Sequence, residues 1–319
     1  MLDDEYHALR THAGVFVLDD RALVRASGAD RVAFLQGMLT NDVTRLGPGD
    51  GCPALLLTIQ GRVVSDLRVA ATADALLLDV DRGARDAVIE SLARLIIADD
   101  VELDVVDDVT LLGLAGPDTP RLAPGLDALP PFAHRETTIA GVALRLVHAS
   151  AVGGEGAILH APAARAGDVR DALAAAGAVF CGRAALEARR IERGIPRTGV
   201  DMGEKTLALE VPVEAAISTT KGCYLGQEVI ARGTARGHVN RRLCGLVFAG
   251  GTPAADARLV HDGREVGQVT SVAYSPALAA PVGLGFVRRE HWEPGTELAV
   301  VDVAGAAAGT ARVAAWPLA

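Results

Sequence analysis

The sequence is poor in cysteine and in aromatic residues. Four cysteines occur among 319 residues and none forms a C-x-x-C pair, which argues against a disulfide scaffold, a zinc ribbon or a dithiol redox site. With 2 Trp, 3 Tyr and 6 Phe, a surface that stacks several bases is not expected. No apolar run reaches the ~18 charge-free residues of a membrane helix. The acidic start Met1–Glu5 also lacks the basic region of a secretory signal, so we expect a cytoplasmic protein without a membrane partner.

Apolar residues and unevenly distributed charge are what the sequence does have. Half of the residues are hydrophobic and 22% are charged, which is enough to bury a sizeable core, and the length predicts two or three domains. The net charge of −9 is uneven, because residues 1–160 carry 24 acidic and 13 basic side chains and residues 161–319 carry 16 and 18. An anionic partner should therefore meet the second half of the chain.

The order of apolar patterns predicts an α+β fold. Residues 14–26 and 55–69 each have the pattern of a β-hairpin, and residues 30–39 and 83–97 have helical spacing, without strict β-α alternation. After residue 240, six short apolar runs alternate with Gly and Pro turns, and no helical pattern separates them. This change predicts a small β-barrel or sandwich at the C-terminal end.

Cys223 is the cysteine with the most informative surroundings. It follows Gly222 and precedes residues 224–232, which can start a helix. A helix N-terminus and the neighbouring Lys221 would both favour the thiolate, and hence a reactive cysteine. The alternative is a small buried residue that packs the turn, which is the usual fate of a free cysteine.

A basic segment follows directly. No acidic residue occurs from Val229 to Ala255, where four arginines and a histidine lie: Arg232, Arg236, Arg241, Arg242 and His238. The segment either attracts a polyanion, such as nucleic-acid phosphates or a ligand with several carboxylates, or is a solvated loop paired with acidic residues of the first half. The sequence leaves both open.

The string Lys221-Gly222-Cys223-Tyr224-Leu225-Gly226-Gln227-Glu228 resembles the K-G-C-Y-x-G-Q-E signature of the YgfZ family of folate-binding proteins. Residues 34–43, 190–196 and 236–242 resemble that family as well. The family is similar to the T-protein of the glycine cleavage system, an aminomethyltransferase that uses tetrahydrofolate. The resemblance implies a multi-lobed α+β body around a central folate hole. Residues 1–240 would form this body as two intertwined lobes, and residues 241–319 the C-terminal β-barrel.

The resemblance also implies a function. The expected protein binds tetrahydrofolate and supports assembly or repair of iron–sulfur proteins, which are its partners, with an effect on tRNA modification through them. Cys223 would be the working thiol, and Asp66 would match the catalytic aspartate of the T-protein, accepting a hydrogen bond or a proton from folate. The residues expected to bind the cofactor are Asn41, Asp66, Lys221, Tyr224, Gln227, Glu228 and Arg232.

Three positions depart from the T-protein pattern, and one of them is Ser65, which stands where the T-protein has the first aspartate of its D-D-L motif. Ile158 stands where the T-protein has its pteridine-binding glutamate, and Leu186 stands where it has an arginine. A buried pteridine needs a bidentate acceptor for its amino group and ring N–H. These departures count against glycine cleavage itself.

Two alternatives belong to other functional classes. In one, the protein is a folate-dependent aminomethyl or one-carbon transferase with Asp66 as base or electrostatic partner. In the other, it is a tRNA-binding module that uses the basic segment, which the scarcity of aromatic residues disfavours. No metal ligands are expected, since the eight histidines are scattered and one cysteine cannot hold a cluster alone.

Overall fold

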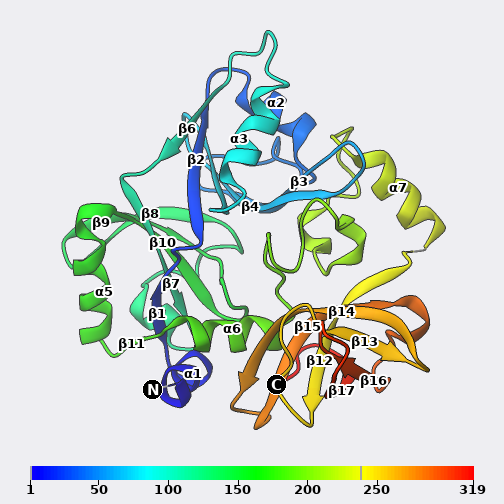
Figure 1. The fold of residues 1–319 in the computed structure, drawn as a ribbon. Coiled ribbons are helices and arrows are strands. Elements are labelled where there is room, and N and C mark those ends of the chain that lie inside the picture. Colours follow the sequence, from blue (N-terminus) through cyan, green and yellow to red (C-terminus); the bar gives the residue numbers. More distant parts are fainter. Residues whose placement is uncertain (1, 238) are drawn as a thin grey trace.

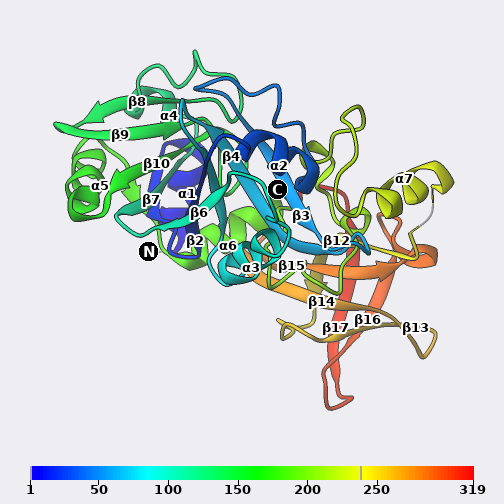
Figure 2. The same ribbon diagram turned by 90° about the horizontal axis from the view of Figure 1, so that it is seen from above.

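The computed structural model describes residues 2–237 and 239–319. Two β-sheets and one closed β-barrel form three bodies around a common centre (Figure 1). Seen from above, the two sheets lie next to each other and the barrel extends beyond them (Figure 2). The predicted α+β class and the predicted C-terminal barrel are confirmed.

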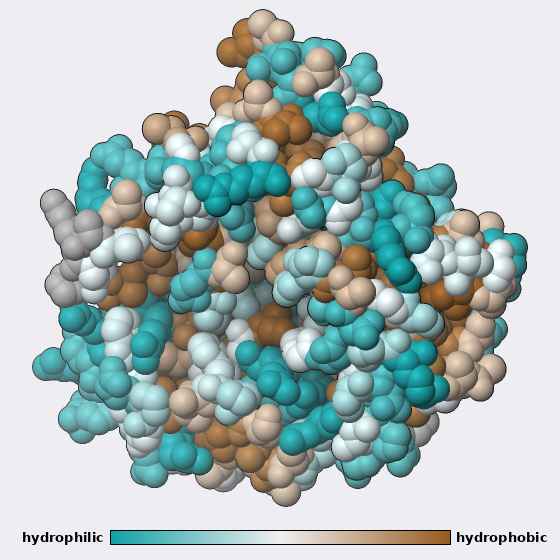
Figure 3. All heavy atoms as spheres, turned by 180° about the vertical axis from the view of Figure 1, so that it is seen from behind, coloured by the Kyte–Doolittle hydropathy of each residue, from teal (hydrophilic) through white to brown (hydrophobic). Residues whose placement is uncertain are grey.

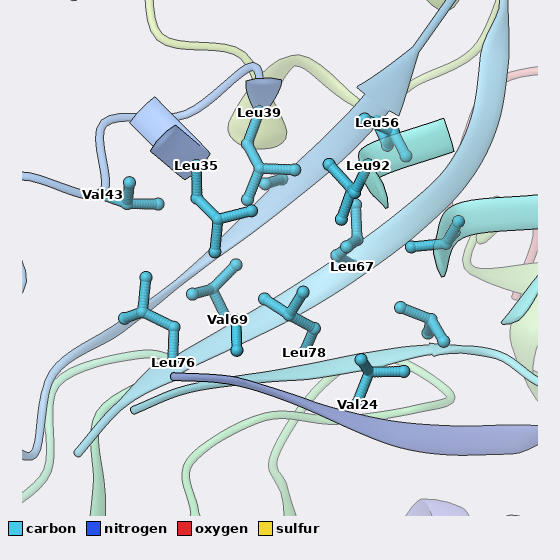
Figure 4. Packing of buried hydrophobic residues seen from close by; sticks show 14 of the residues in the cluster. Val24, Leu35, Leu39, Val43, Leu56, Leu67, Val69, Leu76, Leu78 and Leu92 are labelled. Atoms are coloured by element: carbon cyan, nitrogen blue, oxygen red, sulfur yellow. The ribbon is translucent and has the colours of Figure 1, made fainter. Parts of the chain in front are cut away.

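The first sheet is antiparallel and has the strand order β3-β4-β5-β2-β6. Its strands are β2 (Arg21–Ser27), β3 (Gly51–Leu57), β4 (Val63–Ala71), β5 (Leu76–Asp81) and β6 (Glu102–Val106). Helices α2 (Arg31–Met38) and α3 (Arg85–Ala93) cover one face. There Leu35 and Leu92 of the helices pack against Leu67 and Leu78 of the sheet (Figure 4). The opposite face of β4 is therefore free to carry polar side chains.

The second sheet has the order β11-β1-β7-β10-β9-β8 and is covered on both faces. Its strands are β1 (Gly14–Val17), β7 (Val109–Ala115), β8 (His134–Ile139), β9 (Val142–Val147), β10 (Gly156–Pro162) and β11 (Val179–Phe180). Helices α4 (Thr119–Leu122) and α5 (Ala166–Ala175) lie on one face, and α1 (Leu2–Thr11) and α6 (Arg183–Glu192) on the other. Because both faces are covered, β10 is almost entirely buried.

The barrel closes in the order β12-β15-β14-β13-β16-β17. Its strands are β12 (Arg241–Ala249), β13 (Arg258–His261), β14 (Arg264–Ser275), β15 (Ala280–Arg288), β16 (Glu297–Val301) and β17 (Ala307–Ala314). Its interior is filled by apolar side chains, including Leu246, Phe248 and Leu259. Closure removes the free strand edges that an open sheet of six strands would expose.

The segment between α6 and the barrel has little regular structure apart from short helical turns and one helix. These are η2 (Ala208–Glu210), η3 (Glu214–Ala216) and α7 (Gln227–Arg236); elsewhere the chain has η1 (Ala163–Arg165) and η4 (Arg289–His291). Gly226, before α7, has φ 80°, and a Cβ there would lie 2.5 Å from the Thr58 carbonyl oxygen. In the described residues, none of the helices is long and apolar enough to cross a membrane.

The two predicted hairpins have different outcomes. The hairpin expected over residues 55–69 is confirmed, because β3 and β4 pair antiparallel. The hairpin expected over residues 14–26 is wrong: β1 pairs with β7 and β11, whereas β2 pairs with β5 and β6 in the other sheet. The chain crosses between sheets at Leu18–Asp20, so alternating apolar residues marked both strands correctly but not their partners.

A buried carboxylate joins the ends of the chain to α6. Glu192, at the end of α6, is fully buried. It accepts hydrogen bonds from Tyr6 of α1 (2.6 Å), Arg189 (2.8 Å) and Ser275 of the barrel (2.6 Å). Its backbone carbonyl accepts the Leu318 N–H at 2.8 Å. One residue therefore holds the second sheet, the barrel and the C-terminal tail together.

We expect Glu192→Gln to lower the free energy of unfolding by about 3–5 kcal/mol, because it leaves the buried Arg189 without its counter-charge. Urea unfolding of wild type and variant measures the effect. The matched control is Glu90→Gln, which removes an exposed pair with Arg94 on α3 and should cost less than about 0.5 kcal/mol. Equal unfolding midpoints for Glu192→Gln and the wild type would contradict this role.

Candidate functional site

A cavity of about 240 Å³ lies where the first sheet, the β1–β2 connection and α6 meet. Its polar and charged lining includes Asp19, Asp20, Arg21, Asp66, Arg68, Asp81, Arg183, Glu187, Arg190, Arg197 and Thr198. Its apolar lining includes Phe16, Leu18, Val152, Leu186, Ile195 and Pro196. The face of the molecule opposite to that of Figure 1 is hollowed near its middle (Figure 3). This mixture of apolar walls and a few convergent polar groups is typical of a ligand site.

Asp66 is the predicted site residue that the structure brings into this cavity. It lies on β4, and its side chain is 26% exposed. One carboxylate oxygen, Oδ2, accepts from Arg21 at 2.8 Å, and Oδ1 accepts from the Thr198 hydroxyl at 2.7 Å. Burial alone would raise the pKa of Asp66, but Arg21, Arg68 and the Thr198 hydrogen bond outweigh burial and lower it. Asp66 is therefore an ionised acceptor with lone pairs left for a ligand.

The charge of Asp66 is neutralised by a chain of alternating charges on the first sheet. Arg21 donates to Asp79 Oδ1 at 2.7 Å as well as to Asp66, and Arg68 donates to Asp79 Oδ2 at 2.6 Å. Burial would raise the pKa of Asp79, but the two guanidinium groups overcome burial and lower it. Two carboxylates and two arginines thus share one buried cluster, which is stable only while every member keeps its partner.

The opposite wall of the cavity is a second charged cluster on α6. Glu187 accepts from Arg190 (2.7 Å) and from Arg197 (2.7 Å). Burial opposes ionisation of Glu187, but the two arginines lower its pKa. Arg190 also donates to Asp201 at 2.9 Å and to Ser271 of β14 at 2.7 Å. This wall is therefore tied to the barrel.

The positions that depart from the T-protein pattern lie in different places, and Ser65 is buried on β4 next to Asp66. Leu186 lines the cavity and gives its wall an apolar patch. Ile158 is fully buried on β10 and borders a separate void of about 10 Å³ next to His160. Burial lowers the pKa of His160 to about 4, so its imidazole is neutral near pH 7, and Asp79 lines the same void. The acceptors for a ligand in the cavity are Asp66 and its carboxylate neighbours.

Lys221 and Asn41 form hydrogen bonds within the fold, and neither lines the cavity. The Lys221 ammonium donates to the carbonyl oxygens of Gln36, Leu39 and Asn41 at 2.6–2.9 Å, which caps the C-terminal end of α2. Burial lowers the pKa of Lys221 to about 8. The Asn41 side chain donates to the Pro53 carbonyl at 2.7 Å. The beginning of the signature motif therefore anchors a loop to the end of α2.

The rest of the signature lies at α7. The helix expected within residues 224–232 begins at Gln227. Tyr224 and Gln227 line a groove of about 610 Å³ along the helix, which is separate from the central cavity. Glu228 and Arg232 form an exposed ion pair one turn apart on α7. The structure therefore divides the predicted site residues between the cavity and this second region.

Cys223 is exposed, whereas Cys181 and Cys244 are buried and Cys52 is half-buried. Burial raises the pKa of Cys52 and Cys181 to about 12 and that of Cys244 to about 11. Cys223 lies three residues before Gly226, the N-cap of α7. It is the thiol that a reagent or partner reaches first.

The described arginines of the basic segment have partners within the chain. Arg241 pairs with Glu210 at 3.1 Å and stacks on Phe286, and Arg242 stacks on Trp292. His238 lies outside the described residues, as does the side chain of Arg236. This pairing favours the solvated basic loop over a surface for nucleic acid, although the acidic partners come from the second half of the chain.

Sequence reasoning missed three residues that shape the cavity: Arg21, Glu187 and Thr198. Thr198 and Arg21 contact Asp66 from 132 and 45 positions away. No local pattern reports such pairs. Glu187 had a signal, since Arg190 and Arg197 lie three and ten positions further along the chain, where a helical turn and a return loop can place them.

Comparison with known proteins places the whole chain near one family. Residues 1–221 match the GCVT N-terminal domain, and residues 241–318 match the glycine cleavage T-protein C-terminal barrel domain. An aminomethyltransferase of Geobacillus kaustophilus is 30% identical over 317 residues, covering 95% of this chain and 86% of the relative. That of Thermus thermophilus is 32% identical over 294 residues, covering 89% and 82%. The glycine cleavage system aminomethyltransferase T of Bartonella henselae has the same fold, with a TM-score of 0.88 over all of this chain and 89% of that one, at 22% identity.

We expect Asp79→Asn to destabilise the protein by about 3–5 kcal/mol at pH 7, because the buried Arg21 and the half-buried Arg68 lose the carboxylate that they share. The low pKa of Asp79 means that its stabilising effect is present above pH ~4, the unfolded-state pKa, and is lost as the pH falls through the lower folded-state pKa. Urea unfolding should therefore show that the free energy of unfolding falls less steeply between pH 7 and pH 3 for the variant than for the wild type. The exposed Asp74→Asn is the control (side chain 73% exposed), and parallel curves for Asp79→Asn and wild type would refute the assignment.

Proposed function

The chain belongs to the glycine cleavage T-protein family, and we propose that it binds a tetrahydrofolate in the central cavity and acts as a folate-dependent aminomethyl or one-carbon transferase. The proposal rests on the position and the charge of Asp66. It is an ionised carboxylate, partly exposed, in a cavity with apolar walls. The absence of the pteridine-binding glutamate at Ile158 separates the proposed activity from glycine cleavage itself.

The residues of the cavity fit the ring end of a folate. Phe16, Leu186 and Pro196 supply apolar surface for a flat bicyclic ring, and Asp66 supplies an acceptor for its amino or N–H groups. The cavity, at about 240 Å³, is below the ~300 Å³ at which ligand pockets usually begin, so the remainder of the ligand would extend out of it. We propose that residues 1–240 form this folate-binding part and that residues 241–319 close it.

When bound, tetrahydrofolate would supply the nitrogen atoms that carry the one-carbon unit. Asp66 is a weak general base near pH 7, because its lowered pKa gives it little affinity for a proton and both of its oxygens accept hydrogen bonds. It therefore orients the ligand by accepting a hydrogen bond and stabilises positive charge that develops next to it. Arg21 balances the charge of Asp66 when no ligand is bound. Asp66 therefore stays ionised in the folded protein without taking up a proton.

Titration with tetrahydrofolate derivatives tests this proposal. Asp66→Asn should weaken binding by about ten- to a hundred-fold, which corresponds to the loss of a hydrogen bond to a charged acceptor, and should abolish turnover of tetrahydrofolate with an aminomethyl donor. Asp74→Asn, at an exposed aspartate in the turn between β4 and β5, should bind like the wild type. Binding without turnover by any donor would leave a folate-binding protein and remove the transferase. Absence of binding by the wild type would remove both.

A narrower function, support of iron–sulfur proteins as in the YgfZ family, is favoured by one observation besides the signature motif. Cys223 is exposed next to a loop that Lys221 anchors to α2, whereas the other thiols are at least half-buried. We propose that Cys223 acts on client proteins, with an indirect effect on tRNA modification. Since one cysteine cannot hold a cluster alone, any contact with a cluster would use ligands of the client.

A strain that carries Cys223→Ser should lose the activity of iron–sulfur enzymes under oxidative stress to the level of a strain lacking the protein. Cys52→Ser is the matched control, because burial raises the pKa of that thiol to about 12 and makes it unreactive. Full enzyme activity in the Cys223→Ser strain would sink the role of the thiol. Equal losses in both strains would point to a structural effect instead.

A further inference from the structure

A short loop connects Asp66 to the barrel. Thr198, which is 5% exposed, donates its hydroxyl to Asp66 Oδ1 at 2.7 Å, and the same Thr198 oxygen accepts the backbone N–H of Asp66 at 3.2 Å. These two hydrogen bonds fix both the side chain and the backbone of Asp66 against one hydroxyl group. Arg21 holds the other carboxylate oxygen, so the plane of the carboxylate is set by two partners on different elements.

The loop that carries Thr198 is closed by hydrogen bonds between its own backbone groups. The N–H groups of Asp201 and Met202 both donate to the Arg197 carbonyl, at 2.8 Å and 3.2 Å, and the Gly199 N–H donates to the Met202 carbonyl at 2.8 Å. These bonds close residues 197–202 into a compact turn. The position of Thr198 therefore follows the position of Asp201.

Asp201 is tied to the barrel by a local irregularity in β14. Its Oδ1 accepts from Thr270 at 2.5 Å and from Ser271 at 2.7 Å. Successive strand residues normally point to opposite faces, but the register of β14 shifts between Val269 and Ser271, which lets both hydroxyls reach one oxygen. Oδ2 accepts from Arg190 at 2.9 Å and from the Arg197 N–H at 3.1 Å.

We propose that Thr198 is a positioning residue that orients Asp66, and that the barrel sets the place of Thr198 through Asp201. The importance of Asp66 for ligand binding rests on the proposed function. The hydrogen bonds that orient Asp66 do not depend on it. In this arrangement the barrel does more than cover the cavity. It determines, through five hydrogen bonds and one turn, which lone pairs of Asp66 face the ligand.

The ionisation of Asp66 reports this orientation directly. The Thr198 hydrogen bond favours the charged form, so its loss raises the pKa of Asp66. The other charged groups of the cavity on the sheet side are Arg21, Arg68 and Asp81, with Asp79 behind them. Those on the α6 side are Arg183, Glu187, Arg190 and Arg197, and those of the β1–β2 connection are Asp19 and Asp20. None of them is changed by a substitution at Thr198.

The experiment follows the Asp66 carboxyl carbon by NMR titration of the full-length protein, with the signal assigned by its absence in Asp66→Asn. Thr198→Val should raise the pKa by about one unit, a tenfold change in the protonation equilibrium, and Thr198→Ser should restore it. Thr206→Val is the matched control: Thr206 is equally buried, in the same connecting segment, and its hydroxyl makes no hydrogen bond to the described residues. Thr198→Ala replaces the valine variant if that one does not fold.

Ser271→Ala, on the barrel, should shift the pKa of Asp66 in the same direction by a smaller amount. We expect the protonation equilibrium constant to change about two- to threefold. An unchanged pKa in Thr198→Val would overturn the proposal, and an unchanged pKa in Ser271→Ala would overturn the link to the barrel. Tetrahydrofolate affinity measured on the same variants tests the proposed function separately from the role of Thr198. A wild type that binds no folate refutes the proposed function, whereas the titration without ligand still decides the role of Thr198.

Discussion

Neutralisation of buried charge is the constraint on which the arrangement of the three bodies depends. Where they meet, the chain buries arginines and carboxylates next to an apolar cluster that joins Leu55 of the first sheet and Ile191 of α6 to Leu284 of the barrel. Each wall of the cavity is balanced separately: Arg21 and Arg68 on the sheet with Asp66 and Asp79, and Arg190 and Arg197 on the other side with Glu187 and Asp201. Isolated charges at this depth would be costly, so the three bodies are held at the distances at which the pairs close.

This constraint explains why a carboxylate can face a ligand cavity without disrupting the fold. Asp66 keeps its charge because Arg21 and Thr198 occupy part of its hydrogen-bonding capacity and leave the rest exposed. A site assembled in this way is ready before any ligand arrives, which reduces the ordering that binding would otherwise require. The apolar residues Phe16 and Leu186 complete the lining without adding charge.

The sequence pattern predicted the elements that depend on interactions between residues close together in the chain. The β3–β4 hairpin around Gly61 and the six strands of the barrel follow from alternation and turn residues within a few positions. The partners of β1 and β2 did not, because a connection of three residues sends them into different sheets. Asp66 entered the prediction through a family resemblance alone, since one aspartate between Ser65 and Leu67 on a strand is typical of a solvent-facing position. The role of Lys221 could not be predicted, because the carbonyl groups that it caps lie 180 or more positions away.

The contacts of Glu192 also impose an order of assembly. Besides Arg189, its side chain binds Tyr6 and Ser275, and its carbonyl accepts from Leu318, which follows the last strand of the barrel. When the residues of both sheets have left the ribosome, two of these partners, Ser275 and Leu318, have therefore not yet been synthesised. The junction of α6 can close only after the last strand of the barrel and the tail beyond it have been synthesised. Until that moment the nascent chain carries an incompletely paired carboxylate, so a truncated product would expose the α6 junction to solvent and to quality control rather than accumulate as a folded fragment.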